Sequence, residues 1–351
     1  MNRAELMGVL KKVMSGVEDK NTLLEGANSF MFDDEWIKTF NDEISVSYPF
    51  KSGIKCLVKA QEFFRVLSRI NSDEIKMILL DDGKVQMSGG KTVLKMVSSD
   101  SSSILSLVDN LALGDVKWHK LPKDFVSALS IVSGFATTNT AMTPLCGVSI
   151  ARDGLAASDR MKAGFYPLEF RSLKGDLVLP IGSVKELIKF VDLEEFSVGE
   201  SWVHFKAKSG LQFSVRKLNA DFPRDAIKNF LNFDETDEKQ YVFPSGLLES
   251  IERASVMSFA TQEGSEYVEL SLDAKGNMIV SGAKQYGELK DKIVKDAKWS
   301  FPEDVTLKVQ PAHFAALLAL GNQFYLKDNK YILMKSATFE CILALIIATK
   351  D

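Results

Sequence analysis

The side chains that most often catalyse reactions or bind metals are scarce in this chain and lie far apart in it. The sequence has three histidines, His119, His204 and His313, and no two of them have the spacing of zinc ligands or of an HExxH helix. No GxSxG sequence marks a nucleophile elbow between a strand and a helix. We therefore predict no catalytic residue, no metal site and no cofactor, and we expect a protein that is not an enzyme.

A glycine-rich stretch at 88–92 ends in GKT, as a phosphate-binding loop does. Such a loop also needs a glycine five residues before Gly90, where this chain has Val85, and it must open a helix. The residues that follow alternate in polarity as a strand does. We predict instead a β-hairpin with its turn at Gly89 and Gly90.

Two further features fit turns and packing better than catalysis. Asp159 and Arg160 stand side by side after a strand pattern, and an aspartate at such a place usually accepts hydrogen bonds from nearby backbone amides. Cys56, Cys146 and Cys341 are isolated from one another within apolar segments. This usage predicts buried free thiols in a reducing compartment.

Composition limits the class of protein. The chain has 351 residues, of which 46% are hydrophobic and 26% are charged, as in soluble chains of two or three domains. No apolar run approaches the roughly 18 residues of a membrane helix, and the first residues lack the apolar core of a signal peptide. The net charge of −4 argues against coating nucleic acid by bulk charge. We expect a cytoplasmic protein without membrane contact.

The elements that would position a site recur three times along the chain. Each repeat opens with an amphipathic helix pattern, continues with alternating strand patterns, and then has a second helix and further strands. The opening helices are predicted at 5–17, 123–135 and 245–257, and the second helices at 60–70, 183–191 and 311–320.

This organisation predicts an α+β protein of three similar domains, at 1–116, 117–238 and 239–351. The boundaries fall where the patterns lapse, within the linkers 101–117 and 229–239. Residues 104–111 have enough apolar character to be locally ordered. The alternative is an ordinary α+β enzyme whose thirds resemble one another by accident.

Several short motifs occur in an order that matches a known family. The most specific lie in the middle repeat: LCGV at 145–148 and LAASDR at 155–160 look like a strand pair, LP at 179–180 precedes a helix, and FSVRKL at 213–218 is followed by FP at 222–223. On these motifs the chain resembles the bacterial DNA polymerase III beta subunit, the sliding clamp, along nearly its whole length. Departures from the family pattern are concentrated after the ASD turn, after Pro223 and at the C-terminus, as expected of a divergent member from a phage or an atypical bacterium.

The resemblance implies three repeated clamp domains, with helices lining the inside and antiparallel sheets forming the outside of a closed ring. It implies a processivity factor that encircles double-stranded DNA without sequence preference, tethers the replicative polymerase, is loaded by an ATP-driven clamp loader and closes as a homodimer. Two other functions stay open on the residues alone: an enzyme acting at an inter-domain cleft, and a protein-binding scaffold that never meets DNA.

DNA contact, if the resemblance holds, is expected from basic residues on or beside the predicted helices, through phosphates rather than bases. The third repeat is poor in such residues, because Arg253 is accompanied by Glu249 and Glu252. The candidate DNA-binding residues are Lys11, Lys12, Lys20, Arg65, Arg69, Lys123, Lys185 and Lys189.

The resemblance also implies a pocket for a short extended peptide at the junction of the second and third repeats, and a subunit interface between the first and third. The pocket should combine apolar walls with a polar rim and accept a peptide carrying a Gln and a Leu or Phe anchor. The candidate pocket residues are Leu145, Ser158, Arg160, Met161, Lys162, Ala163, Pro223, Ile227, Leu345, Ile346 and Ile347. The candidate interface residues are Val93, Val256 and Met257.

Overall fold

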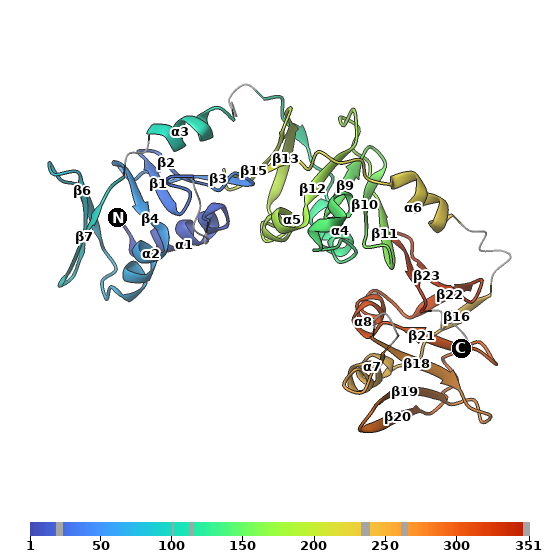
Figure 1. Ribbon diagram of the computed structural model, residues 1–351. Coiled ribbons are helices and arrows are strands. Elements are labelled where there is room, and N and C mark those ends of the chain that lie inside the picture. Colours follow the sequence, from blue (N-terminus) through green and yellow to red (C-terminus); the bar gives the residue numbers. More distant parts are fainter. Residues whose placement is uncertain (19–23, 100–101, 112–115, 233–238, 261–265, 347–351) are drawn as a thin grey trace. The chain divides into compact units, whose positions relative to one another are not determined.

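The computed structural model describes residues 1–18, 24–99, 102–111, 116–232, 239–260 and 266–346 (Figure 1). The chain groups into two compact units. Residues 1–129 and 170–219 form the first unit, and residues 130–169 and 220–351 form the second. Lys20 and Ile347, two of the candidate site residues, lie outside the described residues.

The first unit is built on an antiparallel sheet of eight strands. The strands are β1 Ser29–Asp33, β2 Trp36–Phe40, β3 Ile44–Pro49, β4 Lys55–Lys59, β8 His119–Lys120, β13 Leu193–Val198, β14 Trp202–Ala207 and β15 Gln212–Arg216. Their order is β4-β1-β2-β3-β15-β14-β13-β8. The first and middle repeats therefore share one sheet, and they join where β3 pairs with β15, with Val46 opposite Phe213.

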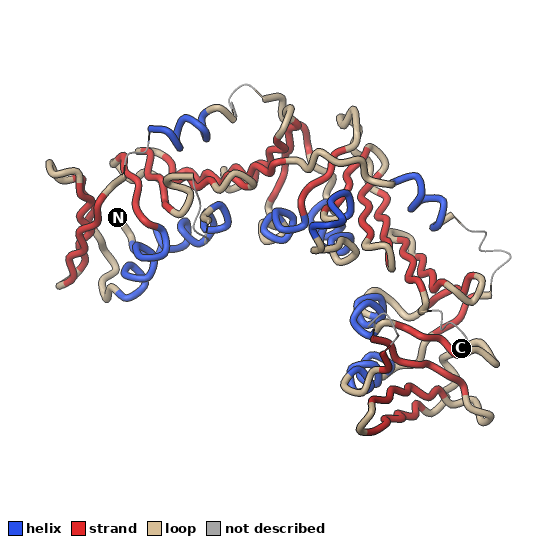
Figure 2. Tube along the Cα trace, in the orientation of Figure 1, coloured by secondary structure: helices blue, strands red, loops and turns tan. Residues whose placement is uncertain are grey.

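Helices cover both faces of this sheet at its β1 end (Figure 2). On one face, helix α2 (Ala60–Arg69) places Phe63 against Phe30 and Phe32 of β1, edge to face. On the other face, Met31 packs in a cluster with residues of helix α3 (Ser102–Asp109). Successive side chains of a strand point to opposite faces, so β1 is apolar at every position between the two layers. The helices of this unit are α1 Arg3–Val13, α2 Ala60–Arg69, α3 Ser102–Asp109 and α5 Ile181–Leu187, with a 3-10 turn η1 at Met14–Gly16.

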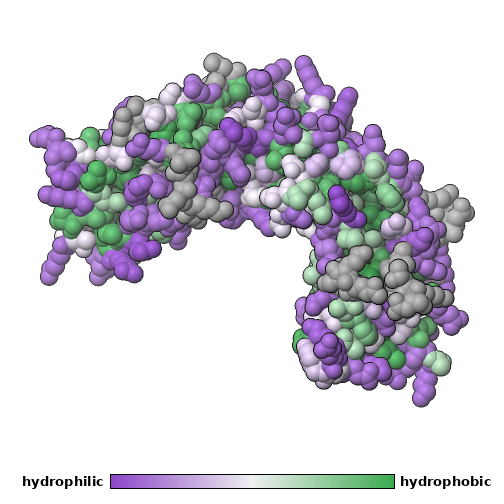
Figure 3. All heavy atoms as spheres, in the orientation of Figure 1, coloured by the Kyte–Doolittle hydropathy of each residue, from purple (hydrophilic) through white to green (hydrophobic). Residues whose placement is uncertain are grey.

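A three-stranded sheet extends the first unit beyond α2. The strands of this sheet are β5 Lys76–Leu79, β6 Lys84–Gly89 and β7 Thr92–Val97. A separate strand, β12 Leu177–Pro180, leads into α5. Strands β6 and β7 form the hairpin predicted from the glycines, with Gly89 opposite Thr92 and Gly90 at a φ of +58°. β7 is an edge strand, and hydrophobic atoms show at the surface over β6 and β7 (Figure 3).

The second unit contains two antiparallel sheets. The strands of the larger sheet that belong to this unit have the order β9-β10-β11-β24-β23-β22-β16, and the smaller sheet has β17-β18-β19-β20 with β21 paired to β18. The strands are β9 Gly147–Ala151, β10 Gly154–Ser158, β11 Lys162–Pro167, β16 Gln240–Val242, β17 Phe259–Ala260, β18 Glu266–Leu272, β19 Met278–Lys284, β20 Gly287–Ile293, β21 Thr306–Val309, β22 Gln323–Lys327, β23 Tyr331–Lys335 and β24 Glu340–Ala344.

Here the middle and last repeats share a sheet, because β11 pairs with β24 and places Gly164 opposite Cys341. Two helices from the last repeat, α7 Leu247–Ser255 and α8 Pro311–Leu318, pack side by side (Figure 1). A third helix, α6 Arg224–Leu231, packs on β10, β11 and β24. Helix α4 Phe125–Ser133 begins in the first unit and ends in the second, and a 3-10 segment η2 follows it at Thr140–Leu145.

The α+β class and the repeated order of elements are confirmed. Within each third of the chain, a helix is followed by antiparallel strands, and a second helix by further antiparallel strands. The predicted helices are present within about a turn of their expected bounds. The two units divide the predicted middle domain, because β13–β15 continue one sheet and β9–β11 continue another. The three-domain boundaries at 116 and 238 remain a prediction.

One of the two linker predictions needs correction. The linker at 101–117 contains α3, which overlaps the stretch 104–111 that was predicted to be locally ordered, and its Ile104 and Val108 are buried one helical turn apart. The linker at 229–239, by contrast, begins inside α6, whose Ile227 and Leu231 are buried at the same spacing. Helix α6 is short and lies next to polar residues, so an amphipathic pattern of about two turns was too brief to stand out.

The cysteines are free thiols: Cys56 and Cys341 are buried, whereas Cys146 is half-buried. Burial raises the pKa of the Cys56 thiol to about 12, so this side chain is a neutral core residue near neutral pH. In the described parts of the chain, no helix has the length and hydropathy needed to cross a bilayer. Those same parts hold no group of His, Cys, Asp and Glu side chains arranged for a metal ion.

Candidate functional site

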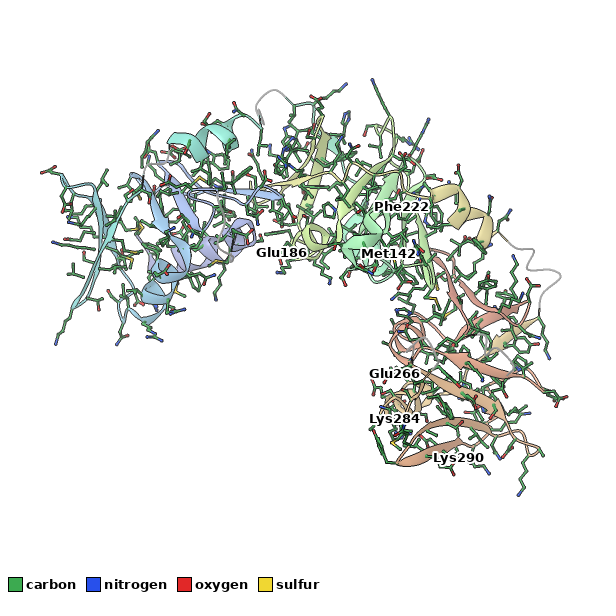
Figure 4. The ribbon with its side chains drawn as sticks, in the orientation of Figure 1. Met142, Glu186, Phe222, Glu266, Lys284 and Lys290 are labelled. Atoms are coloured by element: carbon green, nitrogen blue, oxygen red, sulfur yellow. The ribbon has the colours of Figure 1, made fainter. Side chains whose placement is uncertain are left out.

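A cavity of about 630 Å³ opens in the second unit between α6, the turn from β10 to β11, and the segment η2. Its walls are mainly apolar. Met142, labelled in Figure 4, comes from η2. The lining residues are Ala141, Met142, Pro144, Leu145, Ser158, Arg160, Met161, Lys162, Ala163, Asp221, Pro223, Ala226, Ile227, Phe230, Tyr331, Ile342 and Ala344.

A buried apolar cluster lies beneath this cavity. Ala163 on β11 and Ile342 on β24 are directly paired across the two strands. Ile227 of α6 packs in the same cluster, together with Leu333 of β23. The cavity is therefore formed by α6 and by a sheet assembled from the middle and last repeats, and no single repeat could form it.

The turn from β10 to β11 forms the polar part of the wall. The Asp159 carboxylate accepts hydrogen bonds from the amides of Met161 and Lys162, each at 2.9 Å. The Ser158 hydroxyl accepts from the amide of Arg160 at 3.2 Å and donates to the carbonyl of Lys162 at 2.9 Å. This is the backbone-binding role predicted for Asp159, and it fixes the path of the turn.

Arg160 has an unusual backbone conformation within this turn. Its φ is +78°, in the left-handed region that non-glycine residues seldom occupy. Its side chain is exposed and lines the cavity. No described residue accepts a hydrogen bond from its guanidinium or forms an ion pair with it.

Lys162 differs from Arg160 because its charge is already matched. Its ammonium lies 3.8 Å from Asp159 and its side chain is largely buried. Burial lowers the pKa of Lys162, and the nearby Asp159 carboxylate partly offsets this effect. His313 of α8 approaches the same carboxylate, with Nε2 at 3.3 Å. Burial and the positive charge of Lys162 lower the pKa of His313.

Helix α6 is held in place by a buried arginine at its first position. Arg224 is 6% exposed, and its guanidinium donates to the Ser149 hydroxyl at 3.2 Å and the Gly154 carbonyl at 2.8 Å. It also forms an ion pair with Asp153 at 2.7 Å, and Lys228 contacts the same carboxylate. Partial burial acts to raise the pKa of Asp153, but the hydrogen bonds from Lys228 and Arg224 outweigh it and lower that pKa.

Most of the predicted pocket residues line this one cavity, and two described residues do not. Ile342 and Ala344 of β24 line it, so Leu345 falls on the opposite side by the alternation of a strand. Ile346 has left the strand, and its amide donates to the carbonyl of Lys308 on β21. Leu345 and Ile346 therefore do not line this cavity, and their role in a pocket stays a prediction. The sequence had given no reason to include Met142, Asp221 or Phe230.

The whole chain is similar in structure to bacterial clamps, although its sequence matches no protein-family model and no curated protein. The beta subunit of DNA polymerase from Streptococcus pyogenes has a TM-score of 0.81 at 17% identity over 99% of both chains. The sliding clamp from Bacillus subtilis has a TM-score of 0.79 at 15% identity, over 99% of this chain and 98% of that one. The DNA polymerase III subunit beta from Borrelia burgdorferi, solved with a natural product, has a TM-score of 0.82 at 12% identity, with the same coverage.

The chain has the sliding-clamp fold. The likeness runs from end to end, so it includes the repeated units as well as the junction that holds the cavity. The identities are low, and the likeness therefore establishes the fold and leaves the function to be argued from the residues. Fold class and resemblance, both predicted from the sequence, are confirmed at this level.

Within the clamp fold, the described candidate residues for DNA contact all lie in the first unit. Lys11 and Lys12 are exposed in the last turn of α1, and Arg65 and Arg69 are exposed on the adjacent α2. Lys12 also contacts Tyr48, with its ammonium 3.2 Å from the hydroxyl and 4.5 Å from the ring centre.

The remaining candidates are less well placed. Lys123 was expected on a helix, but it lies in the turn before α4, because the helix begins only at Phe125. Lys185 is exposed on α5. Lys189 follows the end of α5 and forms an ion pair of 2.6 Å with Glu186, labelled in Figure 4, which reduces the charge it can offer a phosphate.

The last repeat of the clamp fold offers little positive charge on its helices. Arg253 of α7 forms an ion pair with Asp291 at 2.5 Å, and α8 carries only His313. The lysines labelled on its strands, Lys284 and Lys290, form ion pairs with Glu266 and Glu288 (Figure 4). This agrees with the asymmetry noted in the sequence.

The candidate interface residues lie beside two edge strands. Val93 is 59% exposed on β7, and Val256 is 68% exposed at the end of α7, which packs on β20. Met257 is different, because its methyl group packs close to Gly287 within its own unit. We therefore expect Val93 and Val256 to be available to a second subunit and Met257 to stabilise the fold of its own chain.

Proposed function

We propose that this chain is a DNA sliding clamp. It would close with a second copy into a ring around duplex DNA, catalyse no reaction, and tether the replicative polymerase during synthesis in the cytoplasm. The observation that carries the proposal is the likeness to solved clamps over 99% of the chain. The end-to-end match favours this function over an enzyme acting at a cleft.

Contact with DNA would come from the exposed basic residues of α1, α2 and α5. Lys11, Lys12, Arg65 and Arg69 bring charge together on two adjacent helices of a chain whose net charge is −4. Long side chains of this kind reach phosphates and do not read bases, which is what movement along any sequence requires. Because a few phosphate contacts bind weakly and are screened by salt, retention on DNA would depend on ring closure.

The cavity beside α6 would bind the polymerase and other partners. Its apolar lining, with a cation and an acid at its edge, suits an extended peptide with a Leu or Phe anchor. Burying one such anchor contributes on the order of 1.5–3 kcal/mol by area, before ordering costs are subtracted. Loading onto DNA would require an ATP-driven clamp loader, since a closed ring cannot thread onto a circle.

The test is topological. The chain is placed on nicked circular DNA with a clamp loader and ATP, and retained protein is measured by gel filtration before and after the circle is cut. We expect long retention on the circle and rapid loss after linearisation. Tight binding to a short linear duplex, or equal retention on cut and uncut DNA, would contradict the proposal. Failure to bind any DNA would instead favour a protein-binding scaffold.

A variant pair tests the helices. Lys12→Ala with Arg65→Ala should weaken binding to linear duplex at low salt without lowering the melting temperature, since both side chains are exposed. Lys55→Ala is the matched control. Lys55 pairs with Asp33, on the face of the sheet opposite Phe32 and α2, and is itself exposed. Binding of Lys55→Ala to the same duplex should equal that of the wild type.

A further inference from the structure

Among the residues that the structure describes, Arg160 is the one lining residue of the cavity that combines a strained backbone with an exposed charge that no described residue matches. Its φ of +78° disfavours any residue with a Cβ, and glycine would be free of that strain. Residues held in such conformations persist where the surrounding structure imposes them, and they cluster at ligand-binding sites. The chain thus has an arginine where the backbone alone would favour glycine.

The turn itself explains the conformation but leaves the side chain unexplained. The hydrogen bonds of Ser158 and Asp159 involve only the backbone amides of Arg160, Met161 and Lys162, and the carbonyl of Lys162. A glycine at position 160 would keep every one of them, since none uses the arginine side chain. Packing does not require the side chain either, because it is exposed.

Among the described residues that line the cavity, Arg160 is the cation left available to a ligand. Lys162 is largely buried and matched by Asp159. The acidic lining residue, Asp221, forms no ion pair with Arg160, and neither does any other residue that the structure describes. A guanidinium at the edge of an apolar cavity favours a planar anion, with which it makes two parallel hydrogen bonds.

We propose that Arg160 determines specificity in this cavity by binding a carboxylate of the incoming peptide, next to the apolar anchor. This rests on the proposed peptide-binding function of the same cavity. The partner is therefore an extended peptide with an apolar anchor and an acidic group beside it. The acidic group is either an Asp or Glu side chain or the C-terminal carboxylate of the partner.

The experiment uses a labelled short peptide with a Gln and a Leu-Phe anchor in a neutral background, titrated onto the full chain by fluorescence anisotropy. In one arm, each position outside the anchor is changed in turn from Asn to Asp. In the other arm, the C-terminus is a free acid or an amide. We expect one acidic peptide to bind about threefold to tenfold more tightly than its neutral twin, with the gain shrinking as salt is raised.

Variants of the residue complete the test. Arg160→Gly should erase the preference and melt at the same or a higher temperature than the wild type. Arg160→Lys should keep part of the preference. The inference about Arg160 fails if the wild type binds neutral and acidic peptides equally well, or if the preference survives in Arg160→Gly. Either outcome leaves the proposed peptide-binding function standing. If the wild type binds no peptide, or if wild type and Met161→Glu bind the peptide with equal affinity, the proposal that this cavity binds peptides fails, and this inference fails with it.

Discussion

The guanidinium of Arg224 donates to the carboxylate of Asp153 over 2.7 Å, although 71 positions of sequence separate the two residues. The contact joins the first turn of α6 to the hairpin of β9 and β10. Helix α6 also carries Ala226, Ile227 and Phe230, which line the cavity. One wall of the candidate site is therefore positioned by a charged contact outside it.

Replacing this arginine should disturb the cavity through α6. We expect Arg224→Met to lower the free energy of unfolding by about 1–3 kcal/mol, because it removes buried hydrogen bonds to Ser149 and Gly154 and leaves Asp153 less well paired. Peptide affinity should fall several-fold at a temperature where the variant is fully folded. Calorimetry and peptide titration measure the two effects. The control Lys228→Met removes a half-exposed partner of the same carboxylate and should change stability by less than about 1 kcal/mol.

A charge placed in the apolar wall should abolish peptide binding. Met161 lines the cavity and is 38% exposed, so Met161→Glu should fold normally while disfavouring an apolar anchor. We expect at least a tenfold loss of affinity for the labelled peptide, and close to wild-type affinity for Met161→Leu. Equal binding by wild type and Met161→Glu, with the same melting temperature, would show that the peptide does not use this cavity.

Ring closure should depend on apolar side chains beside the two edge strands. Val93→Glu together with Val256→Glu should shift the protein from dimer to monomer in sedimentation at micromolar concentration, since each valine is largely exposed in the single chain. Val191→Glu changes an even more exposed valine, at 83%, and serves as the control. A wild type that sediments only as monomer would rule out the proposed ring.

Acid should weaken the first unit through a buried histidine. His204 is buried in the sheet with Nδ1 2.8 Å from the Ser214 hydroxyl, and burial lowers its pKa to about 4 from 6.5. Between pH 6.5 and 4, His204 therefore binds a proton in the unfolded chain and not in the folded chain. The contribution of His204 to the free energy of unfolding is complete above pH 6.5 and is lost as the pH falls toward 4. We expect a loss on the order of 3 kcal/mol across this window.

Urea unfolding at a series of pH values measures this effect, with His204→Gln as the comparison. The variant should be less stable than the wild type above pH 6.5, and the difference should shrink as the pH falls to 4. A difference that stays constant would mean that His204 protonates equally in the folded and unfolded states.

Two glycines should respond in opposite ways to the same change. Gly8 lies within α1 with no atom near its missing Cβ, so Gly8→Ala should stabilise the chain by about 0.5–1 kcal/mol. At Gly282 an added Cβ would lie 2.4 Å from the backbone oxygen of Met257, so Gly282→Ala must displace β19 from α7 and should lower the melting temperature. Thermal unfolding of both variants gives the comparison.

The sequence by itself determined the succession of elements. Helical and strand periodicities are local, and the same order in three thirds of the chain indicated repeated α+β units. The turn at Asp159 was also predictable, because an aspartate bonds to amides only two and three residues away. Local periodicity has a lower limit, and the short helix α6 was missed because its two turns give too few repeats of the helical pattern.

Only the tertiary structure decided which repeats share a sheet and which side chains meet in the cavity. Pairing of β3 with β15 and of β11 with β24 joins strands far apart in sequence, and strand periodicity does not encode a partner. Ala344, the last residue of β24, lines the cavity, whereas Leu345, the next residue along the chain, is buried and does not line it. The strain at Arg160 and the contact between Arg224 and Asp153 depend likewise on where the backbone is held in space.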